Sequence, residues 1–237
     1  MLQQEDGTDD LDFSPRADGR SMTGMVLHWS PRSPYVRRVM VAAHEKGLAD
    51  AFERKRTLVS NFFDPPPEIT VDNPMGKIPT LVLPDGMVLY DSRVICMYFD
   101  SIGRLGPRLY PASGSNAHFP ALRNEALGLG FTDLLITLIV ERNREEKLRS
   151  EEMRRIIIQK CHNTLAGMTQ ELPALKARPF DIGHLSIGCA LAYTDFRFHE
   201  LNWRKREPHL AAWYDTIAAR PSFSATAFVD EASGPKN

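Results

Sequence analysis

The sequence predicts a two-domain protein, an α+β domain followed by an all-helical domain. Residues 25–103 mix short apolar runs with helical patterns, whereas residues 115–228 show helical periodicity only. Between them, residues 104–114 contain glycines and prolines that interrupt both patterns, as a linker does. We expect a disordered, polar N-terminal extension over residues 1–24 and a short tail over residues 229–237.

The first strand and helix have clear local signals. Residues 25–29 form a short apolar run, which ends where two prolines exclude a central strand. Apolar residues at i, i+3, i+4 and i+7 from Val36 then predict a helix. Ser33 is a suitable N-cap before Pro34, and Gly47 is a suitable end for this helix.

The rest of the first half reads as two further strand regions and a helix. Residues 52–59 are expected to form a charged, exposed strand, and residues 61–73 a loop, because three consecutive prolines exclude a helix interior. Apolar runs at 80–83 and 87–89 flank a Pro-Asp-Gly turn and predict a hairpin. A helix that ends at Gly103 follows the hairpin.

The second half is expected to contain four main helices. The third is apolar on nearly all sides, which is typical of a helix buried in a core. The expected ranges are 119–144, 151–177, 182–201 and 208–220.

Composition limits the classes of partner. The 29 basic and 30 acidic residues leave a net charge of -1, whereas proteins that bind nucleic acid or anionic membranes carry a basic excess. No run approaches the ~20 apolar residues of a membrane helix. We therefore expect a small-molecule or protein partner, and neither nucleic acid nor membrane.

The cysteines and histidines give no metal or disulfide signal. Cys96, Cys161 and Cys189 lie far apart in apolar stretches and form no C-x-x-C pair, so we expect buried free thiols in a reducing compartment. The N-terminus lacks the basic start and apolar run of a secretory signal, which also favours the cytoplasm. No metal-binding histidine pair and no glycine-rich nucleotide motif is present, so neither cofactor is expected.

Three motifs in this order resemble the soluble glutathione transferase family, in particular its serine-type, bacterial-like members. Ser30-Pro-Arg-Ser-Pro-Tyr-Val-Arg-Arg-Val39 is similar to the first strand-to-helix turn. Asn73-Pro-Met-Gly-Lys-Ile-Pro79 with Tyr90-Asp-Ser92 is similar to the family's N-P-x-G-x-[IV]-P…[ED]-S signature. Asp181-Ile-Gly-His-Leu-Ser-Ile-Gly-Cys-Ala-Leu191 is similar to the capped core helix of the second domain. Such a protein has a thioredoxin-like N-terminal domain and a helical-bundle C-terminal domain.

The resemblance implies glutathione as cosubstrate and Ser33 as the catalytic residue. A free cysteine thiol titrates near ~8.5, so lowering its pKa by ~2 units requires ~2.7 kcal/mol of preferential thiolate stabilisation. A hydroxyl donor at a helix N-terminus supplies much of this. Without the rest of the chain, Ser33 reads more simply as an N-cap, and Ser30 and Tyr35 are the local alternatives to it.

The resemblance also implies a set of glutathione contacts. Ile78, before an expected cis Pro79, would pair with the cysteinyl part of glutathione as one strand pairs with another. Lys77 would meet the glycine carboxylate. Ser92 would bind the γ-glutamyl carboxylate at a helix N-terminus, and Asp91 would meet the α-amino group. Aspartate stands here where many members carry glutamate.

Other expectations concern the second substrate and the core helix. Tyr35, Phe131 and Leu135 are candidate walls of a pocket for a small electrophile. His184 stands where many members have the aspartate of a capping box, and we expect it to be structural. The resemblance further implies a homodimer and a role in detoxification. Specialised glutathione-dependent isomerases, dehalogenases and lyases, and non-enzymatic interaction proteins, remain open on this fold.

Overall fold

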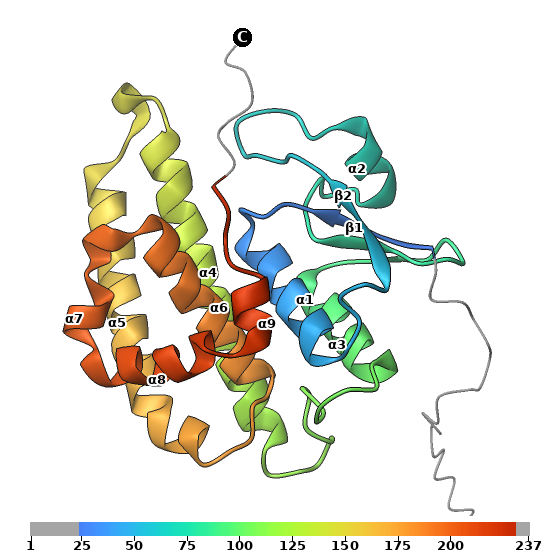
Figure 1. Cartoon of the computed structure of the whole chain (residues 1–237). Coiled ribbons are helices and arrows are strands. Elements are labelled where there is room, and N and C mark those ends of the chain that lie inside the picture. Colours follow the sequence, from blue (N-terminus) through green and yellow to red (C-terminus); the bar gives the residue numbers. More distant parts are fainter. Residues whose placement is uncertain (1–23, 231–237) are drawn as a thin grey trace, which may run out of the picture.

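The computed structural model describes residues 24–230. Of the expected N-terminal extension, residues 1–23 lie outside the described residues, as do residues 231–237 of the expected tail. An α/β half and a helical half lie side by side, and the last described residues run between them (Figure 1).

The α/β half is built on a mixed four-stranded sheet with the order β2-β1-β3-β4. β1 pairs in parallel with β2, and the β1/β3 and β3/β4 pairs are antiparallel. The predicted strands are thus present, and the second ends earlier than expected because its partner β1 ends at Trp29, which pairs with Arg56. The strands are β1 Met25–Trp29, β2 Phe52–Arg56, β3 Thr80–Val82 and β4 Val88–Leu89.

Two helices join this sheet to the helical half. α1 (Pro34–Glu45) and α3 (Ser92–Ile102) pack against each other, and α1 also packs against α6 (Ile182–Arg197). α1 begins where predicted, with Ser33 as its N-cap and Pro34 in its first turn. The loop after β1 is therefore held between the sheet and the helical half.

The prediction of a continuous loop over residues 61–73 was wrong. A short helix, α2 (Pro67–Asp72), lies within it. Pro67 occupies the first turn, where proline's missing N–H breaks no helical hydrogen bond, so the prolines precede the helix rather than interrupt it. The fully buried Ile69 anchors this helix to the core.

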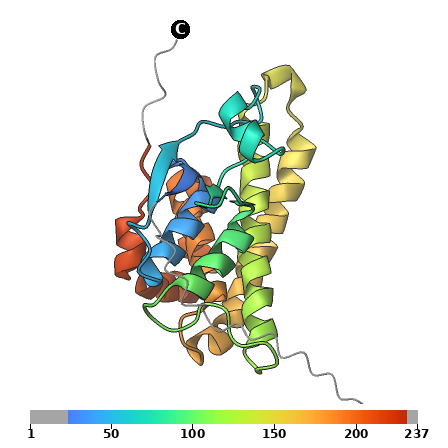
Figure 2. The same cartoon turned by 90° about the vertical axis from the view of Figure 1, so that its right-hand side faces the viewer.

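The helical half surrounds α6, which is buried at every position from Ile182 to Thr194, as the sequence predicted. The helix ends earlier than expected, at Arg197, and a 3₁₀ turn completes the expected range. α4 (His118–Asn143) crosses α6 closely: a Cβ on Gly128 would lie 2.5 Å from the Ser186 carbonyl carbon, which leaves room only for glycine. Figure 2 shows α4 and α5 as two long adjacent helices. The remaining helices are α5 Glu151–Lys176, α7 Trp203–Arg206, α8 Pro208–Ala218 and α9 Pro221–Ala225.

A capping box begins α6, although histidine occupies its third helical position. Asp181 Oδ1 accepts from the backbone N–H groups of Gly183 (2.9 Å) and His184 (3.1 Å). His184 Nε2 lies 2.9 Å from the Leu175 carbonyl oxygen, so this nitrogen carries a proton. Nδ1 lies 3.2 Å from the Asp181 backbone nitrogen, which completes the capping box, and 2.7 Å from Asp181 Oδ1. The ring is buried, and its role in these contacts is structural.

Candidate glutathione site

Three segments meet at one edge of the sheet. His28 pairs with Thr80 in the antiparallel β1/β3 ladder, so the end of β1 lies beside the start of β3. Leu81 pairs with Leu89, which brings the end of β4 to the same edge. The loop that carries Ser33, the Ile78-Pro79 bond and the start of α3 therefore gather there.

Ser33 combines a cap with a free donor. Its backbone is extended (φ -82°, ψ 123°), and its Oγ accepts the backbone N–H of Val36 at 3.3 Å. An oxygen that accepts this bond keeps its own hydroxyl proton for another partner. The side chain is half-buried, so the cap and the catalytic role are compatible.

Ser30 and Tyr35, the local alternatives to Ser33 as the activating residue, have different environments from Ser33. Ser30 is buried, and its Oγ lies 3.4 Å from the backbone nitrogen of Arg32. Tyr35 donates its hydroxyl proton to Asp133 of α4, across the boundary between the halves. Burial, aided by this hydrogen bond and the Asp133 charge, raises the pKa of the Tyr35 phenol, which therefore stays protonated at neutral pH.

The Ile78-Pro79 peptide bond is cis, as the sequence analysis expected. Asn73 fixes the approach to it: its Nδ2 donates to the Lys77 carbonyl (3.1 Å) and to Thr80 Oγ1 (3.0 Å). Thr80 in turn donates to the Lys77 carbonyl (2.8 Å). The Lys77 side chain is exposed, and Ile78 is 8% exposed at the end of the sheet.

Asp91 and Ser92 begin α3. Asp91 is exposed, and its Oδ1 accepts the backbone N–H of Arg93 at 2.9 Å. Ser92 is buried, and its Oγ accepts from Nη1 of Arg38 at 3.2 Å. The sequence analysis did not identify Arg38. A basic residue beside the apolar positions of a predicted helix was the only signal.

Two expected pocket walls are not at a surface. Phe131 and Leu135 have no exposed area and belong to the core, where α4 packs on α6. Helical periodicity marks an apolar face but does not distinguish a face covered by another helix from one open to a ligand. Of the three expected wall residues, Tyr35 alone lies at the boundary between the halves, through its contact with Asp133.

The end of the described chain was a second feature that the sequence analysis missed. Phe228 stacks on Phe196 with ring centroids 4.9 Å apart. Asp230 pairs with Arg32 at 3.3 Å, and the Val229 N–H lies 3.5 Å from the Pro31 carbonyl oxygen. The C-terminal segment thus contacts the loop that leads to Ser33.

The chain's own cysteines are poor candidates for the chemistry. Burial raises the pKa of Cys96 and of Cys161 to about 12 and that of Cys189 to about 11. They therefore stay as thiols at neutral pH. Among the described residues, no three His, Cys, Asp or Glu side chains gather as metal ligands would, and no helix is long and apolar enough to cross a membrane.

Comparisons with known proteins identify the family. Residues 32–102 match the glutathione S-transferase N-terminal domain, and residues 141–216 match the glutathione S-transferase C-terminal domain. A glutathione transferase family member from Pseudomonas fluorescens Pf-5, solved with bound glutathione, is 38% identical. The alignment covers 87% of this chain and 100% of that one, with a TM-score of 0.82. The chain belongs to the glutathione S-transferase family.

Further relatives are similar over most of their length. A glutathione S-transferase from Methylobacillus flagellatus KT with glutathione bound is 33% identical, covers 86% of this chain and 100% of that one, and has a TM-score of 0.78. The uncharacterized GST-like protein YibF of Escherichia coli K12 is 28% identical over 205 residues, which are 85% of this chain and 98% of that one. The predicted architecture, a thioredoxin-like domain followed by a helical domain, is confirmed.

Proposed function

We propose that this glutathione S-transferase homologue is an active transferase, in which Ser33 activates the thiol of bound glutathione for attack on an electrophile. The observation that carries the proposal is the hydrogen bonding of Ser33. Its Oγ already accepts the Val36 N–H, so its O–H is left to donate to a sulfur at the N-terminus of α1. A donated hydrogen bond and the positive end of the helix dipole both favour thiolate over thiol.

In this proposal, glutathione binds along the edge of the sheet where the Ser33 loop, the Ile78-Pro79 bond and the start of α3 gather. The backbone of Ile78 pairs with the cysteinyl residue, and Lys77 meets the glycine carboxylate. Ser92 and the N-terminus of α3 bind the γ-glutamyl carboxylate, and Asp91 meets the amino group. The exposed positions of Lys77 and Asp91 suit charged groups that enter from solvent.

The electrophile binds beside the thiolate at the boundary between the two halves. Tyr35 and Asp133 border this region and place a polar pair there. The sulfur lone pair attacks an electrophilic carbon or a peroxide oxygen, the bond to the leaving group breaks, and that group departs with the electron pair. The enzyme lowers the barrier by stabilising the thiolate in a fixed position.

A cytoplasmic homodimer is part of the proposal. The segment before α2 exposes Phe62 and Phe63, and α3 exposes Val94 and Met97. Exposed apolar groups are typical of an interface, and two-fold dimers are the commonest oligomers. Sedimentation equilibrium at micromolar concentration should give twice the chain mass of 26.7 kDa. A single-chain mass would contradict the dimer.

The test combines binding and turnover. Calorimetry should detect glutathione, and a panel of aryl halides, epoxides, enones and organic peroxides should yield products. Conjugates indicate a general transferase, whereas regeneration of glutathione with one substrate indicates a specialised isomerase, dehalogenase or lyase. Absence of glutathione binding would contradict the proposal and favour a non-enzymatic interaction protein.

A further inference from the structure

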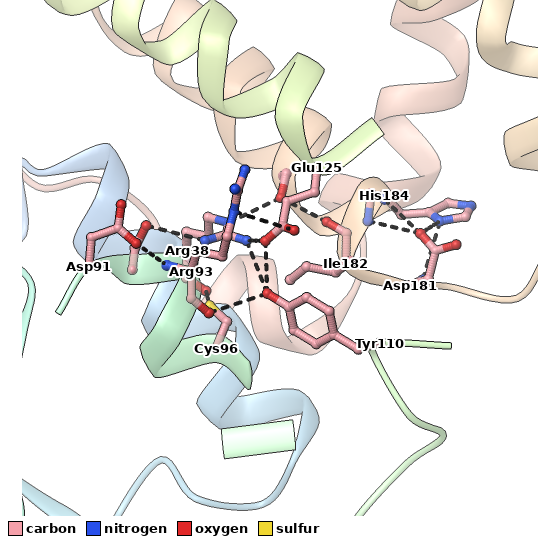
Figure 3. Close-up of polar contacts among 12 residues, drawn as sticks. Arg38, Asp91, Arg93, Cys96, Tyr110, Glu125, Asp181, Ile182 and His184 are labelled. Atoms are coloured by element: carbon pink, nitrogen blue, oxygen red, sulfur yellow. Dashed lines mark hydrogen bonds and ion pairs between the residues drawn. The ribbon is translucent and has the colours of Figure 1, made fainter. Parts of the chain in front are cut away.

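A buried ionic cluster next to Ser92 joins the two halves. Arg38 of α1 is 2% exposed and Glu125 of α4 is 1% exposed, and the two side chains form an ion pair (Figure 3). Arg38 Nε also donates to Ser186 Oγ of α6 at 3.0 Å. Tyr110, in the segment between the halves, donates its hydroxyl proton to Glu125 Oε1 at 2.8 Å. Arg38 therefore contacts both halves from one position.

Stability alone does not account for this cluster. Burying an ion pair costs desolvation free energy, which the attraction between the two charges barely offsets. Apolar residues of similar volume often stabilise a core as well or better. What an apolar pair cannot provide is a fixed direction for a neighbouring hydroxyl. The neighbour in question is Ser92, whose Oγ lies 3.2 Å from Nη1 of Arg38.

The guanidinium determines which way the Ser92 hydroxyl points. Arginine carries five N–H donors and no acceptor, so toward Arg38 the serine oxygen can only accept. The single proton of Ser92 must then point elsewhere. Ser92 is the first residue of α3, and the N-terminus of a helix favours anions.

We propose that Arg38, held by Glu125, is a positioning residue: it orients the Ser92 hydroxyl so that this group donates a hydrogen bond to the γ-glutamyl carboxylate of glutathione. This inference rests on the proposed function. It makes glutathione affinity depend on the helical half, because Glu125 and Ser186 hold the guanidinium in place. Arg38 itself touches no ligand in this account and acts through Ser92.

The test uses a double substitution that avoids an unpaired buried charge. Arg38→Met with Glu125→Gln removes both charges and keeps an amide oxygen to accept from Tyr110. Arg38→Lys is the milder variant, which keeps the charge and shortens the reach. The matched control is Glu45→Gln, which weakens another contact between α1 and the helical half, that with Arg220, but lies at the far end of α1.

Two ligands are titrated by calorimetry: glutathione, and 4-aminobutyryl-cysteinyl-glycine, which lacks only the γ-glutamyl α-carboxylate. In the double variant, the glutathione Kd should rise about tenfold, equivalent to the loss of one hydrogen bond to a charged group. The Kd of the analogue should stay within about twofold, and so should both values in Glu45→Gln. In steady state the KM for glutathione should rise more than kcat falls.

The Ser92→Ala background decides whether Arg38 acts through Ser92. There the double substitution should have no further effect on glutathione binding, because the hydroxyl it directs is gone. The inference is overturned if the losses add in that background, if both ligands weaken equally, or if the double variant binds glutathione as the wild type does. Failure of the wild type to bind glutathione would instead overturn the proposed function, and this inference with it.

Discussion

The guanidinium of Arg220 lies 2.7 Å from Oε2 of Glu45 and ties the segment before α9 to the end of α1. Ser222 donates to the other carboxylate oxygen of Glu45 at 2.5 Å. Burial by itself raises the pKa of Glu45, but the hydrogen bonds from Arg220 and Ser222 and the nearby charges outweigh it, so its pKa lies below the ordinary value. This contact joins the two halves at a point remote from Ser33.

The depressed pKa predicts how stability changes in acid. A carboxyl whose folded-state pKa lies below its unfolded value stabilises the fold above the unfolded pKa, near ~4.3. That contribution is lost as the pH falls through the folded-state pKa. Urea unfolding should find Glu45→Gln less stable than wild type by about 1 kcal/mol at pH 7, since the pair is partly exposed. The difference should shrink below about pH 4, and a difference independent of pH would contradict the assignment.

His184 is predicted to contribute to the stability of the fold and not to glutathione binding. His184→Ala leaves the Asp181 N–H and the Leu175 carbonyl without their buried partner and should cost about 2 kcal/mol of unfolding free energy. His184→Gln supplies one amide oxygen and one N–H donor and should recover much of that loss. Both variants should keep the wild-type Kd for glutathione. A large change in that Kd would show that His184 is more than structural.

Ser33 is predicted to have two separable roles, cap and catalyst. Replacing a serine N-cap by alanine costs about 1 kcal/mol, whereas glycine costs only a few tenths. Ser33→Ala and Ser33→Gly both lack the hydroxyl, so both should lose most turnover while differing in thermal stability. Ser30→Ala is the control and should keep its turnover. Full turnover in Ser33→Gly would mean that the hydroxyl is only a cap.

Tyr35 is predicted to affect the KM for the electrophile and not the thiol pKa of bound glutathione. Its proton is already donated to Asp133, so Tyr35→Phe should leave the thiol pKa of bound glutathione unchanged. The polar pair at the boundary between the halves is lost in this variant, so KM for a polar electrophile should change by about tenfold, the value of one hydrogen bond to a charged group. Steady-state kinetics at saturating glutathione measures this. A raised thiol pKa would instead make Tyr35 part of the activating group.

Much of the fold was predictable because its signals are local. Prolines and glycines mark the turns after β1 and between β3 and β4, and the Asp181 cap marks the start of α6. α2 was missed because proline at a helix start and proline in a loop look alike in sequence. The contacts that hold α2 are tertiary: Ile69 is buried in the core, and Asp72 Oδ2 lies 2.8 Å from His28 Nε2 of β1.

In the candidate site, the Ser33 cap and the cis Ile78-Pro79 bond were predictable from the local sequence, whereas the tertiary contacts were not. Arg38 and Glu125 are 87 residues apart, and the sequence around either residue does not indicate its partner. Phe131 and Leu135 failed as pocket walls for the related reason that periodicity does not reveal what covers an apolar face. α6 covers the face of α4 that carries Phe131 and Leu135, and this packing is a property of the folded helical half.

The most direct test of the central claim is the thiol pKa of glutathione bound to the wild type and to Ser33→Gly. Ultraviolet absorbance of the thiolate is followed from pH 5 to 9 at saturating glutathione. In the wild type we predict a pKa about 2 units below the ~8.5 of a free thiol. In Ser33→Gly, with glutathione still bound, we predict a return most of the way to that value. An equal, undepressed pKa in both proteins would contradict activation by Ser33.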